Sequence, residues 1–599
     1  MLPIAVVLSA SLMSVTPAEQ FLPPTNAWSG ESEMLQVADS HRWVTPSELT
    51  GLTATPSYEE TFSWLDQLLA ASPRFHKLAI GQSAQGRTIW MIIASGDGSN
   101  TPEAMLANER PRVLVQAGIH SGEIDGKDAG LMLLRDLIEG GRLDGLLDEV
   151  NLLFVPILNV DGHERRSPYN RVNQRGPSNM GWRTNANNLN LNRDYAKLDT
   201  AGVRAIAEVV NVWQPQLYLD LHVTDGADYQ YDITYGFNGD HAWSPASSAW
   251  LAEVLTPRVD QALVQRGHEP GPLLFAANDR DFSGGQYRWT AGVRFSNGWG
   301  DARHLPTVLV ENHSLKPYRQ RVLGTYVLLE AALKAAASSP EALREAIAAD
   351  QQPKQRIALG WTVGDSAGQE SFELKAIRAE TYLSEVTGGV EVRWTGDKQP
   401  EQVSIIANDT ASAVTTRPAY YYIPPQWANV IEVLNAQGIV CQAIDSSEPV
   451  TVTRYRLPQA KVDQATTPFE GRLRIAPGGA VSETMSLSLP AGTCRVDTSQ
   501  PLGTLAVLLL EPESPDSLLQ WGFMASMLTR TEYIEGYVIE PMAVAMLEAD
   551  PALRAEFLRK LESDADFASS RRERLRFFYE RTPYYDEHYL LYPIYKSSQ

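Results

Sequence analysis

Short apolar runs alternate with amphipathic segments along the first half of the chain. Four runs have the length and the β-branched content of buried strands, at residues 112–118, 151–157, 216–221 and 307–310. Three longer segments repeat apolar side chains at helical spacing, at residues 127–138, 201–213 and 318–337. Strands that alternate with helices predict an α/β fold, in which a mixed, mainly parallel sheet is flanked by helices.

The pattern changes near residue 345. Later apolar runs are shorter, β-rich and separated by turns, and residues 518–592 are again helical, with many aromatic side chains. We therefore expect a first domain at residues 46–345. A β-rich C-terminal extension with a helical tail is expected to follow at residues 346–599.

The first residues form an apolar leader. Residues 1–15 are apolar and precede the small-residue sequence Thr16-Pro17-Ala18. This run is shorter than the roughly 20 residues that a membrane span needs, and it is typical of a secretory signal peptide. An apolar tail is the alternative, because the first basic residue is Arg42. We expect a signal peptide at residues 1–18, a periplasmic or secreted protein and no membrane span.

Charge and cysteine content narrow the possible functions. The 599 residues include 51 Lys and Arg and 72 Asp and Glu, which gives a net charge of −21. Such an acidic chain is not expected to bind nucleic acid. The two cysteines, Cys441 and Cys494, cannot build a cysteine-rich zinc site. They form either one disulfide in an oxidising compartment or two buried thiols.

Two histidines and two glutamates fall at the carboxyl ends of the expected strands. The first strand leads into His120 and Glu123, the third into His222 and the fourth into Glu311. Ligands bind at this edge of an α/β sheet. A single histidine at a strand end is more often a structural residue than a metal ligand. Four polar residues of this kind at the same edge of the sheet predict a functional site. His120, Glu123 and His222 match the His₂Glu set of a catalytic zinc, which keeps a fourth position for water.

The remaining groups fit a hydrolytic reaction. Glu311 is the candidate general base, which takes a proton from water and passes it to the leaving amine. On its own it would be explained equally well as a strand-end residue paired with an arginine. Arg183 and Arg193 lie between the ligands in the sequence. A guanidinium near zinc stabilises an oxyanion or binds a substrate carboxylate, although either arginine could be a surface charge.

These motifs together resemble the zinc carboxypeptidases of the carboxypeptidase A and B type. The matching motifs are His120-Ser-Gly-Glu123, Asn159-Val-Asp-Gly162, Trp182-Arg183, Leu191-Asn192-Arg193, His222 and Glu311. The resemblance covers about residues 50–340, and residues 81–90 resemble the early hairpin of the family. The second half resembles the C-terminal extension of some bacterial secreted members.

The resemblance implies roles for particular residues. It implies one zinc ion per chain on His120, Glu123 and His222, with Glu311 as the base. It also implies Arg183 as the oxyanion donor. Asn192 and Arg193 would bind the C-terminal carboxylate of the substrate, so that residues are removed from the end of a peptide.

Some positions depart from the family pattern. Asn190 stands where the family usually has an aspartate that orients a zinc-bound histidine, and its amide oxygen can still accept that hydrogen bond. Tyr287 is the candidate for the tyrosine that caps the substrate. Four arginines crowd the same segment, at positions 280, 288, 294 and 303. If they line the pocket they favour an acidic substrate side chain, and solvated charges are the alternative.

The sequence therefore predicts a zinc-dependent metallocarboxypeptidase that acts on peptides with a free C-terminus. One alternative is a zinc amidase or deacylase for cell-wall peptides or acyl-amino acids, because the same ligands serve that reaction. Another is a non-catalytic binding protein built on a peptidase fold, against which Glu311 and Arg183 argue. The side-chain specificity, the natural substrate and the oligomeric state stay open.

Overall fold

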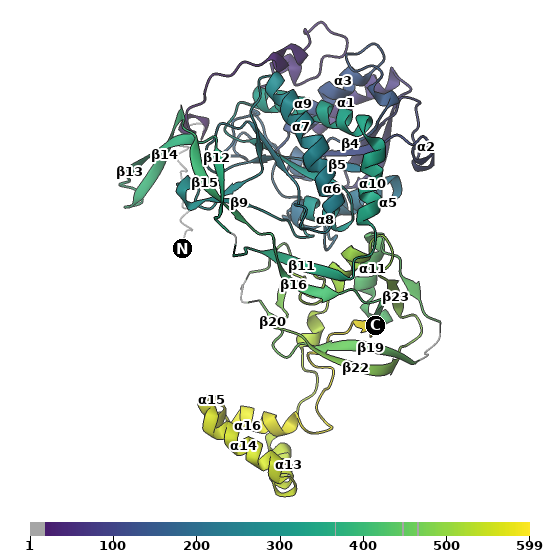
Figure 1. Ribbon diagram of the computed structural model, residues 1–599, viewed down its shortest axis with the longest axis vertical. Coiled ribbons are helices and arrows are strands. Elements are labelled where there is room, and N and C mark those ends of the chain that lie inside the picture. The colour runs from purple at the N-terminus through teal and green to yellow at the C-terminus, as the bar shows by residue number, and fades with distance from the viewer. Residues whose placement is uncertain (1–17, 366, 446–448, 464–466, 599) are drawn as a thin grey trace, which may run out of the picture. The chain divides into compact units, whose positions relative to one another are not determined.

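The chain forms two compact units (Figure 1). The computed structural model describes residues 18–365, 367–445, 449–463 and 467–598. The first unit comprises residues up to 419, 429–442 and 496–517, and the second comprises residues 420–428, 443–495 and those from 518 onward. The predicted signal peptide, at residues 1–18, lies outside the described residues except for its last position.

An eight-stranded mixed sheet forms the centre of the first unit, as predicted. Its order is β1 (Phe75–Gln82), β2 (Thr88–Ala94), β4 (Asn151–Val155), β3 (Arg112–Ala117), β5 (Leu217–Thr224), β10 (Thr307–His313), β6 (Ile233–Gly236) and β7 (Pro270–Pro272). The four central strands, from β4 to β10, are parallel to one another. Antiparallel pairs flank them, between β1 and β2, β2 and β4, and β10 and β6.

Helices flank this sheet (Figure 1). They are α1 (Tyr58–Ala70), α2 (Pro102–Ala107), α3 (Asp125–Leu137), α4 (Val160–Glu164), α5 (Ala201–Trp213), α6 (Pro245–Trp250), α7 (Thr256–Gln265), α8 (Ser296–Ala302), α9 (Tyr318–Ser338) and α10 (Pro340–Asp350). The predicted α/β arrangement is confirmed, and α3, α5 and α9 lie where the helical periodicity placed them. Two strands are longer than predicted, so that His222 and Glu311 lie inside the ends of β5 and β10.

The first unit continues beyond residue 345, where we expected the first domain to end. A four-stranded sheet explains this difference, with the order β12 (Glu370–Leu374), β15 (Glu401–Ala407), β9 (Gln286–Arg288) and β8 (Phe275–Ala276). Strand β15 pairs with β9, so residues on both sides of the expected boundary share one sheet. The unit also contains β11 (Arg356–Thr362), β13 (Ile377–Leu383), β14 (Val390–Lys398), β16 (Thr410–Thr416) and the buried α12 (Gly503–Leu510).

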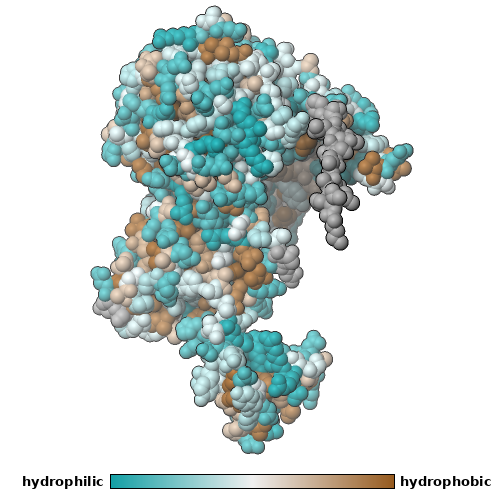
Figure 2. All heavy atoms as spheres, turned by 180° about the vertical axis from the view of Figure 1, so that it is seen from behind, coloured by the Kyte–Doolittle hydropathy of each residue, from teal (hydrophilic) through white to brown (hydrophobic). Residues whose placement is uncertain are grey.

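The hairpin of β13 and β14 carries exposed apolar side chains. Leu383 and Val386 are 77% and 95% exposed. Figure 2 shows hydrophobic and hydrophilic side chains side by side on this hairpin, as on other parts of the same face of the first unit.

The second unit is β-rich and ends in helices, as predicted. Its sheet has the order β18 (Gln442–Ala443), β23 (Cys494–Asp497), β17 (Tyr420–Ile423), β24 (Tyr595–Ser597), β19 (Pro449–Arg456) and β22 (Val481–Ser488), and β20 (Lys461–Val462) pairs with β21 (Ile475–Ala476). The helices of this unit are α13 (Gly536–Ala549), α14 (Pro551–Ser563), α15 (Ala565–Ser569) and α16 (Arg571–Tyr579), whereas α11 (Ala428–Ala436) belongs to the first unit except for its first residue. Phe557, Phe567 and Phe577 form the core of the last four helices.

The structure answers one question that the sequence left open. Both cysteines, Cys441 and Cys494, are disulfide-bonded.

Among the residues that the structure describes, no helix is both long and apolar enough to cross a membrane.

Glycine is required where α3 lies closest to the sheet. A Cβ atom at Gly130 would come within 2.6 Å of Cε1 and 2.8 Å of Cε2 of Phe154 on β4. We expect Gly130→Ala to lower the free energy of unfolding by about 1–3 kcal/mol, because the ring has no room to move in a packed core. Thermal unfolding of the purified variant measures this loss.

Gly202→Ala in α5 is the matched control. Its added methyl group would lie 3.0 Å from the end of the flexible Leu191 side chain and at an ordinary contact distance, 3.6 Å, from Leu158, and alanine favours the helix. We expect its stability to equal or exceed that of the natural chain. Equal melting temperatures for Gly130→Ala and Gly202→Ala would contradict the close packing of α3.

Candidate metal centre

Three potential metal ligands lie at the carboxyl ends of two adjacent strands. His120 and Glu123 follow β3, and His222 lies in β5, which pairs with β3 in parallel. Gly118 turns the chain after β3 with a φ of +67°, which is unfavourable for other residues. The backbone N–H of Glu123 then donates to the carbonyl of His120 at 2.9 Å. This turn explains the three-residue spacing, because it directs both side chains to one point.

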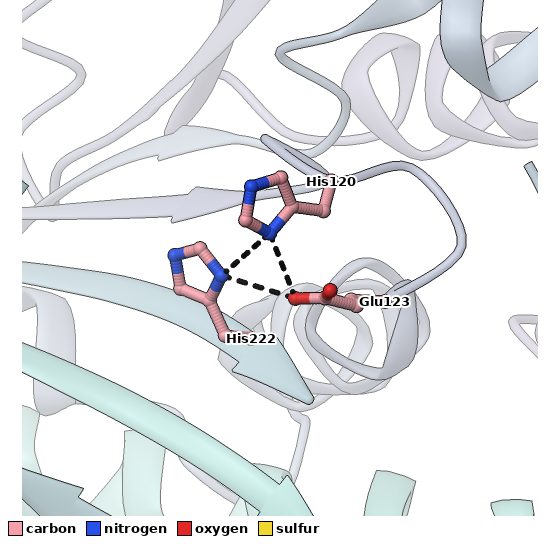
Figure 3. A group of neighbouring side chains, drawn as sticks. All are labelled: His120, Glu123 and His222. Atoms are coloured by element: carbon pink, nitrogen blue, oxygen red, sulfur yellow. Dashed lines mark hydrogen bonds and ion pairs between the residues drawn. The ribbon is translucent and has the colours of Figure 1, made fainter. Parts of the chain in front are cut away.

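The three ligand atoms form a compact triangle (Figure 3). Nδ1 of His120 lies 3.2 Å from Nδ1 of His222, and Oε2 of Glu123 lies 3.1 Å from the first nitrogen and 3.0 Å from the second. Ligands of a tetrahedral zinc ion with bonds of about 2.0–2.1 Å are roughly 3.3 Å apart. The triangle therefore has the dimensions of one face of such a site.

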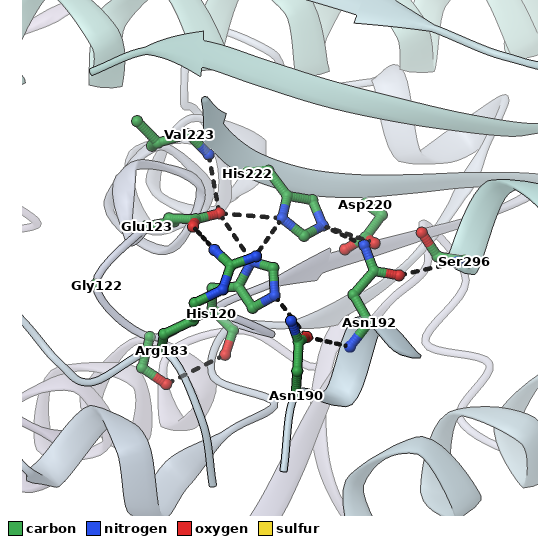
Figure 4. A network of polar contacts seen from close by, with 12 residues as sticks. His120, Gly122, Glu123, Arg183, Asn190, Asn192, Asp220, His222, Val223 and Ser296 are labelled. Carbon is green, nitrogen blue, oxygen red and sulfur yellow. Dashed lines mark hydrogen bonds and ion pairs between the residues drawn. The ribbon is translucent and has the colours of Figure 1, made fainter. Parts of the chain in front are cut away.

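The hydrogen-bond partner of Nε2 determines which nitrogen of each imidazole carries the hydrogen (Figure 4). Nε2 of His120 lies 2.8 Å from Oδ1 of Asn190, and Nε2 of His222 lies 2.9 Å from Oδ2 of Asp220. Both oxygens accept hydrogen bonds, so each Nε2 carries the hydrogen and each Nδ1 keeps a lone pair. Two facing lone pairs beside a carboxylate oxygen suit a cation, so these residues fit a zinc ion.

Electrostatics make the two histidines unequal. Burial lowers the pKa of His120 to about 4, so this ring is neutral near pH 7. Burial also opposes charge on His222, but Asp220 and Glu123 outweigh it and raise the pKa of that ring well above its usual value. A metal and a proton therefore compete for the lone pair on Nδ1 of His222.

Glu311 faces this triangle from the neighbouring strand. It lies on β10 directly opposite His222 in the parallel register of β5 and β10. Burial raises the pKa of its carboxyl group to about 8, and the nearby charges of Glu123 and Asp220 act in the same direction, whereas His222 opposes them. A carboxyl group with such a pKa can gain and lose a proton near neutral pH.

All eight candidate site residues line a single cavity of about 570 Å³ in the first unit. They are His120, Glu123, Arg183, Asn192, Arg193, His222, Tyr287 and Glu311. Most of the remaining wall is aromatic or aliphatic, from Val223, Phe275, Trp289, Phe295, Leu309 and Val363. Charged groups therefore lie beside an apolar space that can receive a side chain.

Asn192 and Arg193 are held in a short helical turn. Oδ1 of Asn192 accepts a hydrogen bond from the backbone N–H of Ser296 at 3.0 Å. The guanidinium of Arg193 lies over the ring of Phe295, 4.5 Å from its centre. Buried Asp194 closes the loop by accepting from the backbone N–H groups of Asp199 and Thr200. These bonds keep both side chains at the cavity.

The other family-like motifs build the scaffold around the site. Asn159 donates from Nδ2 to the carbonyl of Arg183 at 3.3 Å, and its own carbonyl accepts from Ser121 at 2.6 Å. Asp161 binds the early hairpin through Ser83 and Arg87, each at 2.7 Å. These residues fix the loops that carry His120 and Arg183.

Four arginines that we considered for an acidic-substrate pocket do not line this cavity. Arg280 pairs with Glu391 and Arg288 with Glu370, and Arg294 lies 3.6 Å from Asp516. Arg303 is buried and donates to the carbonyl of Gln437. The hypothesis was wrong for this cavity because each guanidinium has a partner elsewhere.

Two residues of the site escaped the sequence analysis. Asp220 orients His222, and the signal for it was a charged residue inside an apolar run, two positions before a histidine on the same strand. Its Oδ1 accepts from Nε2 of Gln116 at 2.8 Å. Arg171 pairs with Glu123 at 3.0 Å, and no local pattern marks it because it lies in an irregular segment.

The hydrogen bond to Asn190 can be tested through metal binding. We expect Asn190→Ala to weaken zinc affinity 10- to 100-fold, because His120 loses the acceptor that fixes its tautomer. Competition with a chromophoric chelator measures the affinity. Asn187→Ala, at an exposed position of the same loop, is the control and should bind zinc as the natural chain does. Equal affinities for both variants would contradict this role of Asn190.

Several known carboxypeptidases are similar to this chain. Residues 61–235 match the zinc carboxypeptidase family. Carboxypeptidase 2 of Trichophyton rubrum is 23% identical over 79% of this chain and 85% of its own length, and human carboxypeptidase D is 30% identical over 26% of this chain and 13% of its own. The carboxypeptidase A structure from Helicoverpa armigera aligns with a TM-score of 0.36 and 18% identity, over 47% of this chain and 74% of its own.

The expected link to bacterial members is not supported, because Trichophyton rubrum, whose carboxypeptidase 2 aligns along most of the chain, is a fungus. The matched region holds the three ligand residues together with Arg183, Asn192 and Arg193. Residues 61–235 thus match the zinc carboxypeptidase family, and most of the chain is similar in sequence to a carboxypeptidase.

Proposed function

We propose that this protein is a zinc-dependent carboxypeptidase that removes residues from the free C-terminus of peptides. The observation that carries this proposal is the triangle of two Nδ1 atoms and one carboxylate oxygen, with side distances of 3.0–3.2 Å, in a cavity that also holds Glu311. One zinc ion bound by His120, Glu123 and His222 would act as a Lewis acid toward the scissile carbonyl and would activate water.

Glu311 is the general base of the proposed reaction. Its raised pKa lets it hold the proton taken from water and then release it to the leaving amine. Arg183 stabilises the negative charge that develops on the carbonyl oxygen, because its half-exposed guanidinium reaches into the cavity.

Asn192 and Arg193 restrict the reaction to the C-terminal end of the substrate peptide. A guanidinium beside an amide can bind a carboxylate through charge-assisted hydrogen bonds. Both side chains line the cavity, and the guanidinium of Arg193 lies over the ring of Phe295. A peptide bound there by its terminal carboxylate places its last side chain in that apolar space. Tyr287, 42% exposed on β9, is positioned to cover the bound peptide.

The disulfide supports export of the protein. Disulfides persist in oxidising compartments, and both cysteines are disulfide-bonded. We therefore propose a periplasmic or secreted location, in agreement with the apolar leader at residues 1–18.

Peptide digestion followed by mass spectrometry tests the proposed activity. The zinc-loaded protein should shorten peptides one residue at a time from the C-terminus, and the same peptides with an amidated C-terminus should be cut much more slowly. Glu311→Gln should lose at least about 10²-fold in kcat, because the general base is absent, while its zinc affinity stays close to that of the natural chain.

Three results would contradict the proposal. They are cuts inside the peptide, equal rates on free and amidated peptides, and an unchanged kcat for Glu311→Gln. Release of acyl groups from acyl-amino acids, without any action on peptides, would favour the amidase alternative.

A further inference from the structure

The two oxygens of Glu123 have different partners. Oε2 faces the two imidazoles and accepts from the backbone N–H of Val223 at 3.2 Å. Oε1 points the other way and lies 3.0 Å from Nη1 of Arg183 and 3.0 Å from Nη1 of Arg171. One carboxylate oxygen therefore has two guanidinium partners, and the second of them has no role in the proposed reaction.

The two arginines differ in how firmly they are held. The side chain of Arg183 is 42% exposed. Within the described part of the chain, Glu123 is the one ion-pair partner of its guanidinium. The side chain of Arg171 is only 10% exposed. Its Nε donates to Oε1 of Gln174 at 3.1 Å and its Nη2 to the carbonyl of Val223 at 3.4 Å. Arg171 is therefore fixed, whereas Arg183 is free to turn.

Gly122 makes room for the fixed arginine. A Cβ atom at this position would lie 2.6 Å from Cγ and 2.8 Å from Cδ of Arg171. The carbonyl of Gly122 also accepts from Nε2 of Gln174 at 2.9 Å, and the same glutamine holds Nε of Arg171. The loop between the ligands His120 and Glu123 is thus shaped around the stem of Arg171.

We propose that Arg171 is a positioning residue that keeps Oε2 of Glu123 directed at the two imidazoles, so that Arg183 can leave Glu123 for the substrate. A buried carboxylate that loses its partner is strongly destabilised. With Arg171 in place, Glu123 stays paired when Arg183 turns toward the carbonyl oxygen. The role of Arg183 rests on the proposed function, whereas the role of Arg171 toward Glu123 does not.

The same substitution at both arginines separates the two roles. Arg171→Met should weaken zinc affinity 10- to 100-fold, measured without substrate by competition with a chromophoric chelator. Arg183→Met should change zinc affinity by less than about fivefold, because Glu123 stays paired with Arg171 and the half-exposed Arg183 contributes little. It should instead lower kcat on a peptide by about 10²- to 10³-fold, because the oxyanion loses its donor.

Two further variants distinguish positioning from a loss of packing. Gly122→Ala keeps Arg171 but displaces its stem, and its Cβ would also lie 2.9 Å from the carbonyl oxygen of Gly181, so it should weaken zinc affinity as well. Arg171→Lys restores a positive charge and should recover part of the affinity that Arg171→Met loses. Thermal unfolding without metal checks that each variant is folded. If Arg171→Met does not fold, Gly122→Ala and Arg171→Lys are compared with the natural chain, and both should bind zinc more weakly than it does.

Natural zinc affinity in Arg171→Met would overturn the proposal. Equal losses of affinity in Arg171→Met and Arg183→Met, or no recovery in Arg171→Lys, would do the same. The zinc measurements stand apart from the peptide assay. A protein that binds zinc as described but does not shorten peptides would contradict the proposed function and leave the positioning role of Arg171 intact.

Discussion

The site depends on one arrangement: two imidazole nitrogens with lone pairs that face each other across 3.2 Å beside a carboxylate oxygen. Such a group of acceptors repels itself unless a proton or a metal cation lies among them. The hydrogen bonds from Nε2 of His120 to Asn190 and from Nε2 of His222 to Asp220 prevent either ring from turning its lone pair away. The hydrogen bonds around both rings therefore suit a site that could hold a metal ion.

The fold stabilises this arrangement in the protein interior, where a buried charge without a partner is destabilising. Glu123 and Asp220 are almost completely buried, and an unpaired carboxylate there would be destabilising by several kcal/mol. Gln116 on β3 pairs with Asp220, and arginines from irregular segments pair with Glu123. The parallel strands supply rigid positions, and the loops supply the compensating charges.

Local patterns in the sequence predicted the elements that local forces determine. Helix α5 spans the predicted residues 201–213 because its apolar periodicity is strong, and polar residues at the ends of apolar strands pointed to the ligands. Contacts between distant segments left no such pattern. Arg171 reaches Glu123 only because an irregular segment folds over Gly122, and β15 extends the first unit only because it pairs with β9. Periodicity carries no information about either contact.

Anomalous diffraction at the zinc absorption edge, from crystals of the zinc-loaded protein, tests the central claim most directly. We expect one strong peak per chain in the cavity, about 2.0–2.1 Å from Nδ1 of His120, Nδ1 of His222 and Oε2 of Glu123. Nε2 of each ring should still be hydrogen-bonded to Asn190 or Asp220. A peak bound through either Nε2, or a zinc-loaded protein without a peak at these three residues, would contradict the account.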